Sequence, residues 1–188
     1  MNLKILFLVI SVSFPASGWA VEIAGIDLPN TLPLNEITLV LNGSGLRTKT
    51  IFSIKVYAAG LYLQEQTEDG GAVVAGDIPM AIRMVFIYDG VSAEKLVNAW
   101  NEGFENAGAE LSLGDEIGIF NACFSQEARE GDVYDLVYLP GQGVEVKIKG
   151  VRKAVIPGLP FKRALFSIWL GDDPCDDDLK VELLGRKE

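Results

Sequence analysis

A hydrophobic pattern with a period of two recurs along this chain and constrains its fold more than any other feature. Successive side chains of a β-strand point to opposite faces of a sheet, so a strand with one buried face alternates between apolar and polar residues. The pattern predicts five strands, at residues 36–46, 52–63, 80–88, 132–139 and 144–149, and Gly150 starts another turn into residues 151–156. Between the fourth and fifth of these, Pro-Gly-Gln-Gly at 140–143 has the length and composition of a hairpin turn.

Other segments have the spacing of amphipathic helices. We predict helices at residues 93–107, 115–124, 161–170 and 176–184. In the first of them Leu96, Trp100 and Phe104 recur every four residues and therefore share one face. The polar, Gly-rich segment 64–79 is expected to be a loop with room for one helical turn. Strands and helices in this order favour an α+β fold, a large antiparallel sheet covered on one face by a layer of helices.

Residues 1–20 have the three parts of a secretory signal peptide. Lys4 supplies the positive charge, residues 5–14 form an uncharged apolar run, and Gly18 and Ala20 are the small residues before the cut. The apolar run is shorter than the roughly 20 residues that a membrane-spanning helix needs. We therefore expect cleavage after Ala20 and export, with the periplasm as the destination. An uncleaved membrane anchor and a buried first helix are the alternatives.

The expected mature chain, residues 21–188, has the size of one domain with a sizeable core. Its first part, residues 21–33, is punctuated by Gly and Pro and is expected to be an irregular lead-in to the sheet. No later segment is apolar for long enough to span a membrane, and no repeat or linker divides the chain. We therefore expect a single domain without a transmembrane segment.

Charge and the absence of histidine exclude several classes of function. The formal net charge is −10, and loss of Lys4 with the signal peptide makes it −11, so the chain repels nucleic-acid phosphates and anionic lipid surfaces. A chain with 0 histidines can use neither a Ser-His-Asp nor a Cys-His mechanism. The acidic segment 172–178 lacks the spacing of an EF-hand, so we interpret it as a solvated loop and expect no metal and no cofactor.

The chain has two cysteines, Cys123 and Cys175. In an oxidising compartment they could form one disulfide, and closing a loop of about 50 residues would stabilise the fold by about 4 kcal/mol. The alternative is two separate thiols, one in an apolar helical stretch and one in an acidic loop. Because the sequence does not give the distance between the two residues, both alternatives stay open.

Two residues are candidates for binding a ligand. Arg47 lies between two apolar strands, where a charge is costly unless it meets an anion, and its guanidinium can grip a carboxylate at two points. Tyr57 lies ten residues later in the next strand, and a buried tyrosine needs a partner for its hydroxyl. If the two strands pair, the two side chains can converge on one pocket. A surface arginine with a structural salt bridge, and an ordinary core tyrosine, are the competing interpretations.

The segment 41–63, LNGSGLRTKTIFSIKVYAAGLYL, resembles the signature of the chalcone isomerase-like superfamily. In that signature a small-residue segment ends in Gly-x-Arg and is followed by a strand of the form K-x-x-A-x-G-x-Y-L. The hairpin DLVYLPGQGVEVKIKG and the tail, FKRALFSIWLG followed by LKVELLG, are similar to a bacterial exported branch of the superfamily. The resemblance extends over about residues 30–185. It implies an open-faced sandwich with a ligand cleft between the sheet and the helices.

The resemblance also implies roles for the two candidate residues. In true chalcone isomerases the arginine at the place of Arg47 orients the substrate oxygen, and a threonine occupies the place of Tyr57. In the non-catalytic fatty-acid-binding members an arginine and a tyrosine at these places hold the fatty-acid carboxylate. The tyrosine and asparagine that the enzymes carry on the following helix segment are not matched, because Tyr88 and Asn98 are out of register.

Three hypotheses follow from these residues. The first is an exported, non-catalytic binding protein for a small amphipathic carboxylic acid such as a fatty acid, held by Arg47 and Tyr57. The second is an isomerase or intramolecular lyase of the chalcone isomerase type in which Arg47 stabilises an oxyanion. The third is a structural or partner-binding module of the cell envelope, in which side chains fill the cleft.

Overall fold

The computed structural model describes residues 20–49, 54–109 and 113–186, so all but the last residue of the predicted signal peptide lies outside the described residues. The described chain is built on a seven-stranded antiparallel sheet with the strand order β3-β4-β5-β6-β7-β8-β9. Each strand therefore pairs with its neighbours in the sequence. The strands are β3 (Thr31–Leu34), β4 (Ile37–Lys49), β5 (Ile54–Leu63), β6 (Met80–Phe86), β7 (Val133–Leu139), β8 (Gly143–Ile148) and β9 (Val151–Ile156).

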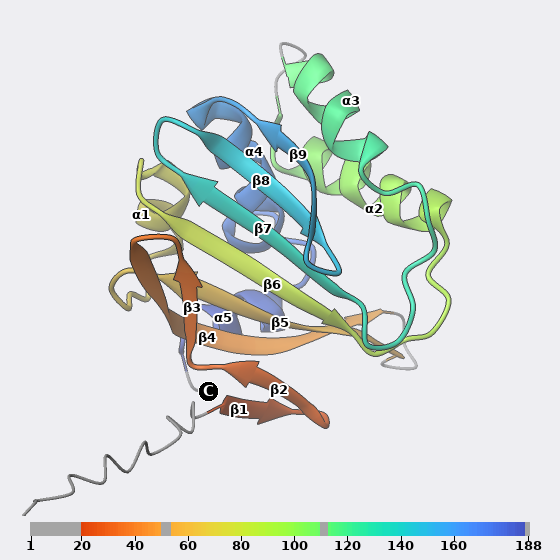
Figure 1. The fold of residues 1–188 in the computed structure, drawn as a ribbon, viewed down its shortest axis with the longest axis horizontal. Helices are drawn as coiled ribbons and strands as arrows, with labels where there is room; N and C mark the ends of the chain where they lie inside the picture. The colour runs from red at the N-terminus through yellow and green to blue at the C-terminus, as the bar shows by residue number, and fades with distance from the viewer. Residues whose placement is uncertain (1–19, 50–53, 110–112, 187–188) are drawn as a thin grey trace, which may run out of the picture.

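The helices lie in the longer connections of the sheet and gather on one side of it (Figure 1). One connects β5 to β6, two connect β6 to β7, and the last two follow β9. They are α1 (Gly70–Ala75), α2 (Ala93–Asn106), α3 (Gly114–Ala122), α4 (Leu159–Leu170) and α5 (Asp177–Leu183). α4 packs against α1 and α2, and α5 packs against β4. This arrangement confirms the predicted α+β fold, and no helix of the described residues is long and apolar enough to cross a membrane.

The main core lies between the sheet and the helices because alternate strand residues point to that side. In β5, Tyr57, Ala59, Leu61 and Leu63 belong to this core, whereas Ala58 and Tyr62, which alternate with them, do not. The opposite sheet face has a smaller apolar cluster that includes Tyr62. Farther along that face the sheet is polar and includes an ion pair of Arg83.

Small residues in β4 allow α5 to lie directly on the sheet. A methyl group on Gly43 would lie 2.5 Å from the Leu183 carbonyl oxygen and 2.8 Å from the Gly185 nitrogen, so only glycine permits this approach. Beside it, the Asn42 side chain donates a hydrogen bond to the same Leu183 carbonyl at 2.8 Å. The small-residue segment of the sequence therefore positions α5, which begins beside Arg47.

The predicted strands and helices are confirmed with boundaries shifted by a few residues, and so is the turn that joins β7 to β8. The expectation of an irregular lead-in is wrong. Residues 20–34 form β1 (Ala20–Ile23) and β2 (Ile26–Pro29), which pair with each other, and β3, which pairs with β4. Positive φ angles at Ala24 and Gly25 in the first turn and at Asn35 in the second reverse the chain, and Gly and Asn are residue types that adopt this conformation readily.

Candidate functional site

Arg47 and Tyr57 are direct neighbours across two paired strands. β4 and β5 are antiparallel, and their register sets Arg47 opposite Tyr57, just before an irregularity between Arg47 and Thr48. Directly opposite residues of an antiparallel pair lie on the same face of the sheet. Both side chains line one cavity on the side of the helices. The sequence indicates that the two side chains can share a pocket if their strands pair. β4 and β5 do pair, and Arg47 and Tyr57 line the same cavity.

The cavity has a volume of about 600 Å³, within the range of small-molecule sites. β4, β5 and β6 form one wall, α2 and α4 form another, and the segment between α4 and α5 closes one side. Apolar side chains dominate these walls, and the polar groups stand among them at a few places. The apolar lining includes Ile54, Val56, Phe86, Val91, Leu96, Ala99, Trp100 and Ile168, and the charged lining is Arg47, Lys49, Lys95 and Glu102.

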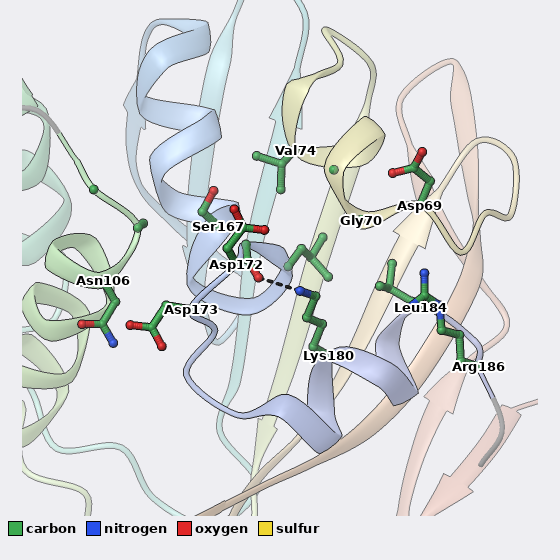
Figure 2. Close-up of a pocket in the computed structure, with 15 residues that line it drawn as sticks. Asp69, Gly70, Val74, Asn106, Ser167, Asp172, Asp173, Lys180, Leu184 and Arg186 are labelled. Carbon is green, nitrogen blue, oxygen red and sulfur yellow. Dashed lines mark hydrogen bonds between the residues drawn. The ribbon is translucent and has the colours of Figure 1, made fainter.

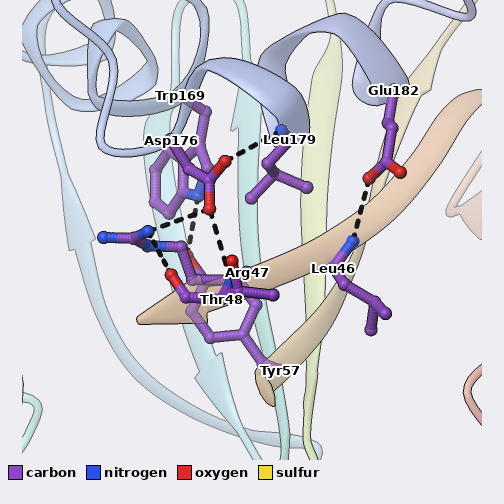
Figure 3. Close-up of polar contacts among 8 residues, drawn as sticks. All are labelled: Leu46, Arg47, Thr48, Tyr57, Trp169, Asp176, Leu179 and Glu182. Carbon is purple, nitrogen blue, oxygen red and sulfur yellow. Dashed lines mark hydrogen bonds and ion pairs between the residues drawn. The ribbon is translucent and has the colours of Figure 1, made fainter. Parts of the chain in front are cut away.

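Arg47 is hydrogen-bonded to a carboxylate and to the backbone (Figure 3). Its Nη1 donates to Asp176 Oδ2 at 2.9 Å and to the carbonyl oxygen of Thr48 at 2.6 Å. The exposed fractions of the two charged side chains are 22% for Arg47 and 11% for Asp176. Among the described residues, no hydrogen bond involves Nε or Nη2 of Arg47, so these donors are left for a further acceptor.

Asp176 is held by the backbone as well as by Arg47. Its Oδ2 accepts a hydrogen bond from the Thr48 nitrogen at 3.3 Å, and its Oδ1 accepts one from the Leu179 nitrogen at 3.1 Å. The second bond makes Asp176 the N-cap of α5, which satisfies one of the free N–H groups at the start of that helix. The carboxylate is thus tied to a strand, a helix and a guanidinium (Figure 3).

Tyr57 is buried, and its hydroxyl accepts a hydrogen bond from Nε1 of Trp169 at 3.0 Å (Figure 3). Because the oxygen accepts from Trp169, the hydroxyl proton of Tyr57 can be donated elsewhere. The ring packs edge-on against Phe86 with the ring centres 5.7 Å apart. Burial raises the pKa of Tyr57 well above its usual value, so the side chain is a neutral hydrogen-bond donor at physiological pH.

Cys175 and Cys123 are free thiols, so the possible disulfide is not formed in this structure. The two side chains have different surroundings. Cys175 lines the cavity beside Tyr57, and burial raises its pKa to about 11. Cys123 follows α3, donates to the Ile119 carbonyl oxygen at 3.5 Å, and lies near Lys153. The alternative of two separate thiols is the one that the geometry supports.

The sequence did not identify several residues of this site. Asp176 is not part of a solvated acidic loop, as the sequence predicts, but the N-cap of α5, and its position three residues before Leu179 at the start of a predicted helix is the signal of such a cap. Tyr88 and Asn98 were set aside because their register did not match the catalytic members of the superfamily. Both nevertheless line the cavity, as does Trp100, whose buried Nε1 has no partner among the described residues.

A second cavity of about 480 Å³ lies on the other side of the α4 terminus (Figure 2). It is bordered by α1, the end of α2, and α5, and its lining is polar. Lys180 crosses it to donate to the Gly171 carbonyl oxygen at 2.7 Å, and Asp172 and Asp173 line it as well. Opposite charges are mixed here and the groups are partly exposed, so this cavity has no concentrated charge or apolar wall to select a ligand.

Comparisons with known proteins agree with this architecture. A family model described as chalcone isomerase-like matches residues 20–185. The structure is similar to the crystal structure of a fatty-acid binding protein from Arabidopsis thaliana, with a TM-score of 0.75 and 20% sequence identity over 88% of this chain and 96% of that chain. At this identity the likeness establishes a shared fold. No curated protein matches the chain in sequence.

Proposed function

The chain belongs to the chalcone isomerase-like family, and from this premise we propose that it is a non-catalytic binding protein for a small amphipathic carboxylic acid, such as a fatty acid. The observation that carries the proposal is the position of Arg47 opposite Tyr57 on the wall of a mainly apolar cavity of about 600 Å³. The name of the Arabidopsis protein with the same fold supports the same class of ligand.

The chemistry of the wall suits an amphipathic acid. A carboxylate at the strand end would accept charge-assisted hydrogen bonds from the guanidinium of Arg47 and a further bond from the Tyr57 hydroxyl. The hydrocarbon tail would lie along the apolar side chains of β5, β6 and α2, where each buried methylene contributes about 0.8 kcal/mol. The raised pKa of Tyr57 favours this role, because a phenol donates to an anion and a phenolate does not.

Binding is tested by isothermal titration of the purified domain with laurate and palmitate, together with native mass spectrometry for acids that co-purify. We expect Arg47→Gln to weaken binding by about 10-fold to 100-fold, the usual effect of losing hydrogen bonds to a charged group. Tyr57→Phe should weaken it by about 10-fold, because one hydrogen bond is lost and the ring is kept.

Arg83→Gln is a matched control for Arg47→Gln. Arg83 has the same exposed fraction of 22% and is paired with Asp135 at 2.7 Å, but it lies on the opposite face of the sheet. Its loss should leave binding within about twofold of the wild type, since remote sites contribute independently. If neither acid binds, or if Arg47→Gln and Arg83→Gln behave alike, the proposed ligand class is wrong.

A second candidate is an intramolecular lyase of the chalcone isomerase type, and the presence of Tyr88 and Asn98 in the cavity wall favours it. In that case Arg47 would stabilise a developing oxyanion. Decay of a hydroxychalcone's visible absorbance tests it, and a rate equal to that in buffer alone rules out this chemistry. The Arg47–Asp176 ion pair fits the third hypothesis, a structural envelope module, but the open cavity beside Tyr57 argues against it.

We also propose that the protein acts outside the cytoplasm, in the periplasm of its cell. The support is the sequence of residues 1–20, and the family match begins at residue 20, at the end of this segment. Cell fractionation of a C-terminally tagged chain, followed by N-terminal sequencing, tests the proposal. The expected first residue is Val21, whereas a retained N-terminus in the cytoplasmic fraction would contradict it.

A further inference from the structure

We propose that Asp176 determines the head-group selectivity of the cavity by competing with an anionic ligand for Arg47. The inference rests on the proposed binding function and goes beyond it, because it makes Asp176 an internal substitute for the ligand carboxylate. Arg47 by itself would make the cavity prefer a carboxylate to a neutral head group on the same hydrocarbon chain. With Asp176 beside Arg47, this preference should be weaker.

The geometry is that of an occupied anion site. Asp176 presents a carboxylate oxygen to the guanidinium at 2.9 Å, the contact that a bound acid would make. The same oxygen accepts from the Thr48 nitrogen, so two donors at the end of β4 converge on one anionic atom. With an exposed side-chain fraction of 11%, this carboxylate is also little screened by water.

Asp176 cannot leave this position freely, because its other oxygen caps α5. Oδ1 accepts from the Leu179 nitrogen, and α5 is in turn seated on β4 through Gly43 and Asn42. A ligand carboxylate must therefore use the remaining donors of Arg47, Nε and Nη2, while Asp176 stays within a few ångströms. Two carboxylates at that separation repel each other, which disfavours the charged form of either.

The other charged groups on the cavity wall do not cancel this effect. Lys49 and Lys95 attract an anion and Glu102 repels it, but Lys49, Lys95 and Glu102 lie toward solvent, where salt screens their influence. Arg47 is the half-buried residue of the charged lining, and together with its ion-pair partner Asp176 it carries no net charge. The head group therefore meets a dipolar site, and neutralising Asp176 should convert it into a cationic one.

The test compares Asp176→Asn with Asp177→Asn. Asparagine keeps the capping oxygen for Leu179 and removes the charge. Asp177 is the next residue, is exposed in the first turn of α5, and undergoes the same change of charge without contact to Arg47. Each protein is titrated with laurate and with dodecanol, which share a twelve-carbon chain and differ in the charge of the head group. Circular dichroism and thermal unfolding confirm that each variant is folded.

We expect Asp176→Asn to raise the affinity for laurate about 10-fold or more, since the opposing charge lies within a few ångströms, and to change that for dodecanol by less than about twofold. Asp177→Asn should change neither by more than about twofold. Asp176→Ser, which also caps the helix without a charge, should repeat the result if the asparagine variant does not fold.

Two negative results are distinguishable. If laurate and dodecanol bind to the wild type but the ratio of their affinities is the same in Asp176→Asn, Asp176 does not set selectivity and only this inference fails. If no protein of the set binds either compound while all are folded, the proposed function fails and this inference with it.

Discussion

Replacing Gly43 by alanine tests the argument that α5 can pack directly on the sheet only because β4 has no side chain at this position. The new methyl group would lie closer than 3 Å to three backbone atoms, the carbonyl oxygens of Glu182 and Leu183 and the nitrogen of Gly185. Backbone atoms cannot rotate away, so the end of α5 must move by about 1 Å to restore contacts of ordinary length. The shift would also stretch the hydrogen bond from Asn42 to Leu183, now 2.8 Å.

The expected cost follows from these contacts. Overpacking of this kind destabilises by about 1–3 kcal/mol, and stretching a buried hydrogen bond adds about 1 kcal/mol, against a gain of about 0.4–1 kcal/mol from the stiffer unfolded chain. We therefore expect Gly43→Ala to lower the free energy of unfolding by about 1–3.5 kcal/mol. The measurement is urea unfolding followed by circular dichroism, with the slope checked for constancy.

Two other glycines provide matched controls. At Gly45 the methyl group would meet the side chain of Glu182, which can rotate at the loss of its hydrogen bond to the Leu46 nitrogen, so the cost should be about 1 kcal/mol. At Gly118, inside α3, nothing lies within 4 Å, and alanine should stabilise the helix by about 0.5–1 kcal/mol. A value for Gly43→Ala no larger than that for Gly45→Ala would refute the backbone-contact argument.

Three further predictions concern the buried lysine, the cavity and the thiols. Lys162 is fully buried, donates to the carbonyls of Val73, Val74 and Gly76, and has a pKa that burial lowers from 10.5 to about 8. Between these pH values the unfolded chain holds a proton that the folded chain has released. The unfolding free energy of the wild type, measured relative to that of Lys162→Met, should therefore rise from about pH 8 upward by at most about 1.4 kcal/mol per pH unit when both are unfolded in urea at pH 7.5, 8.5 and 9.5. The comparison cancels the opposite slope from thiols such as Cys175, whose pKa is raised in the fold. Ala99→Trp should fill part of the cavity and weaken laurate binding by about 10-fold or more while the unfolding free energy changes by less than about 1 kcal/mol, because Ala99 is exposed on α2; unaltered affinity would place the ligand elsewhere. Denatured, unreduced protein should titrate with a thiol reagent as two free thiols, from Cys123 and Cys175, and a count of zero would show that they pair.

The sequence by itself determined the kinds of elements and their order. Alternation along β4, β5, β7 and β8, and fourfold spacing in α2, are local patterns, and local burial on one face produces them wherever the strand or helix is placed. The same reasoning made the meeting of Arg47 and Tyr57 depend on a single condition, the pairing of β4 with β5. β1, β2 and β3 were missed because four-residue strands are too short to display a period.

Only the tertiary structure decided what surrounds the two candidate residues. The partner of Arg47 is 129 residues away in the sequence, and the partner of Tyr57 is 112 residues away. Such contacts depend on how α4 and α5 settle on the sheet, which in turn depends on Gly43 and on the cap at Asp176. No local pattern encodes a distance across the fold, because packing of whole elements sets it. The sequence thus indicated an arginine and a tyrosine that could share one pocket, and the fold added Asp176, the aspartate that is paired with this arginine.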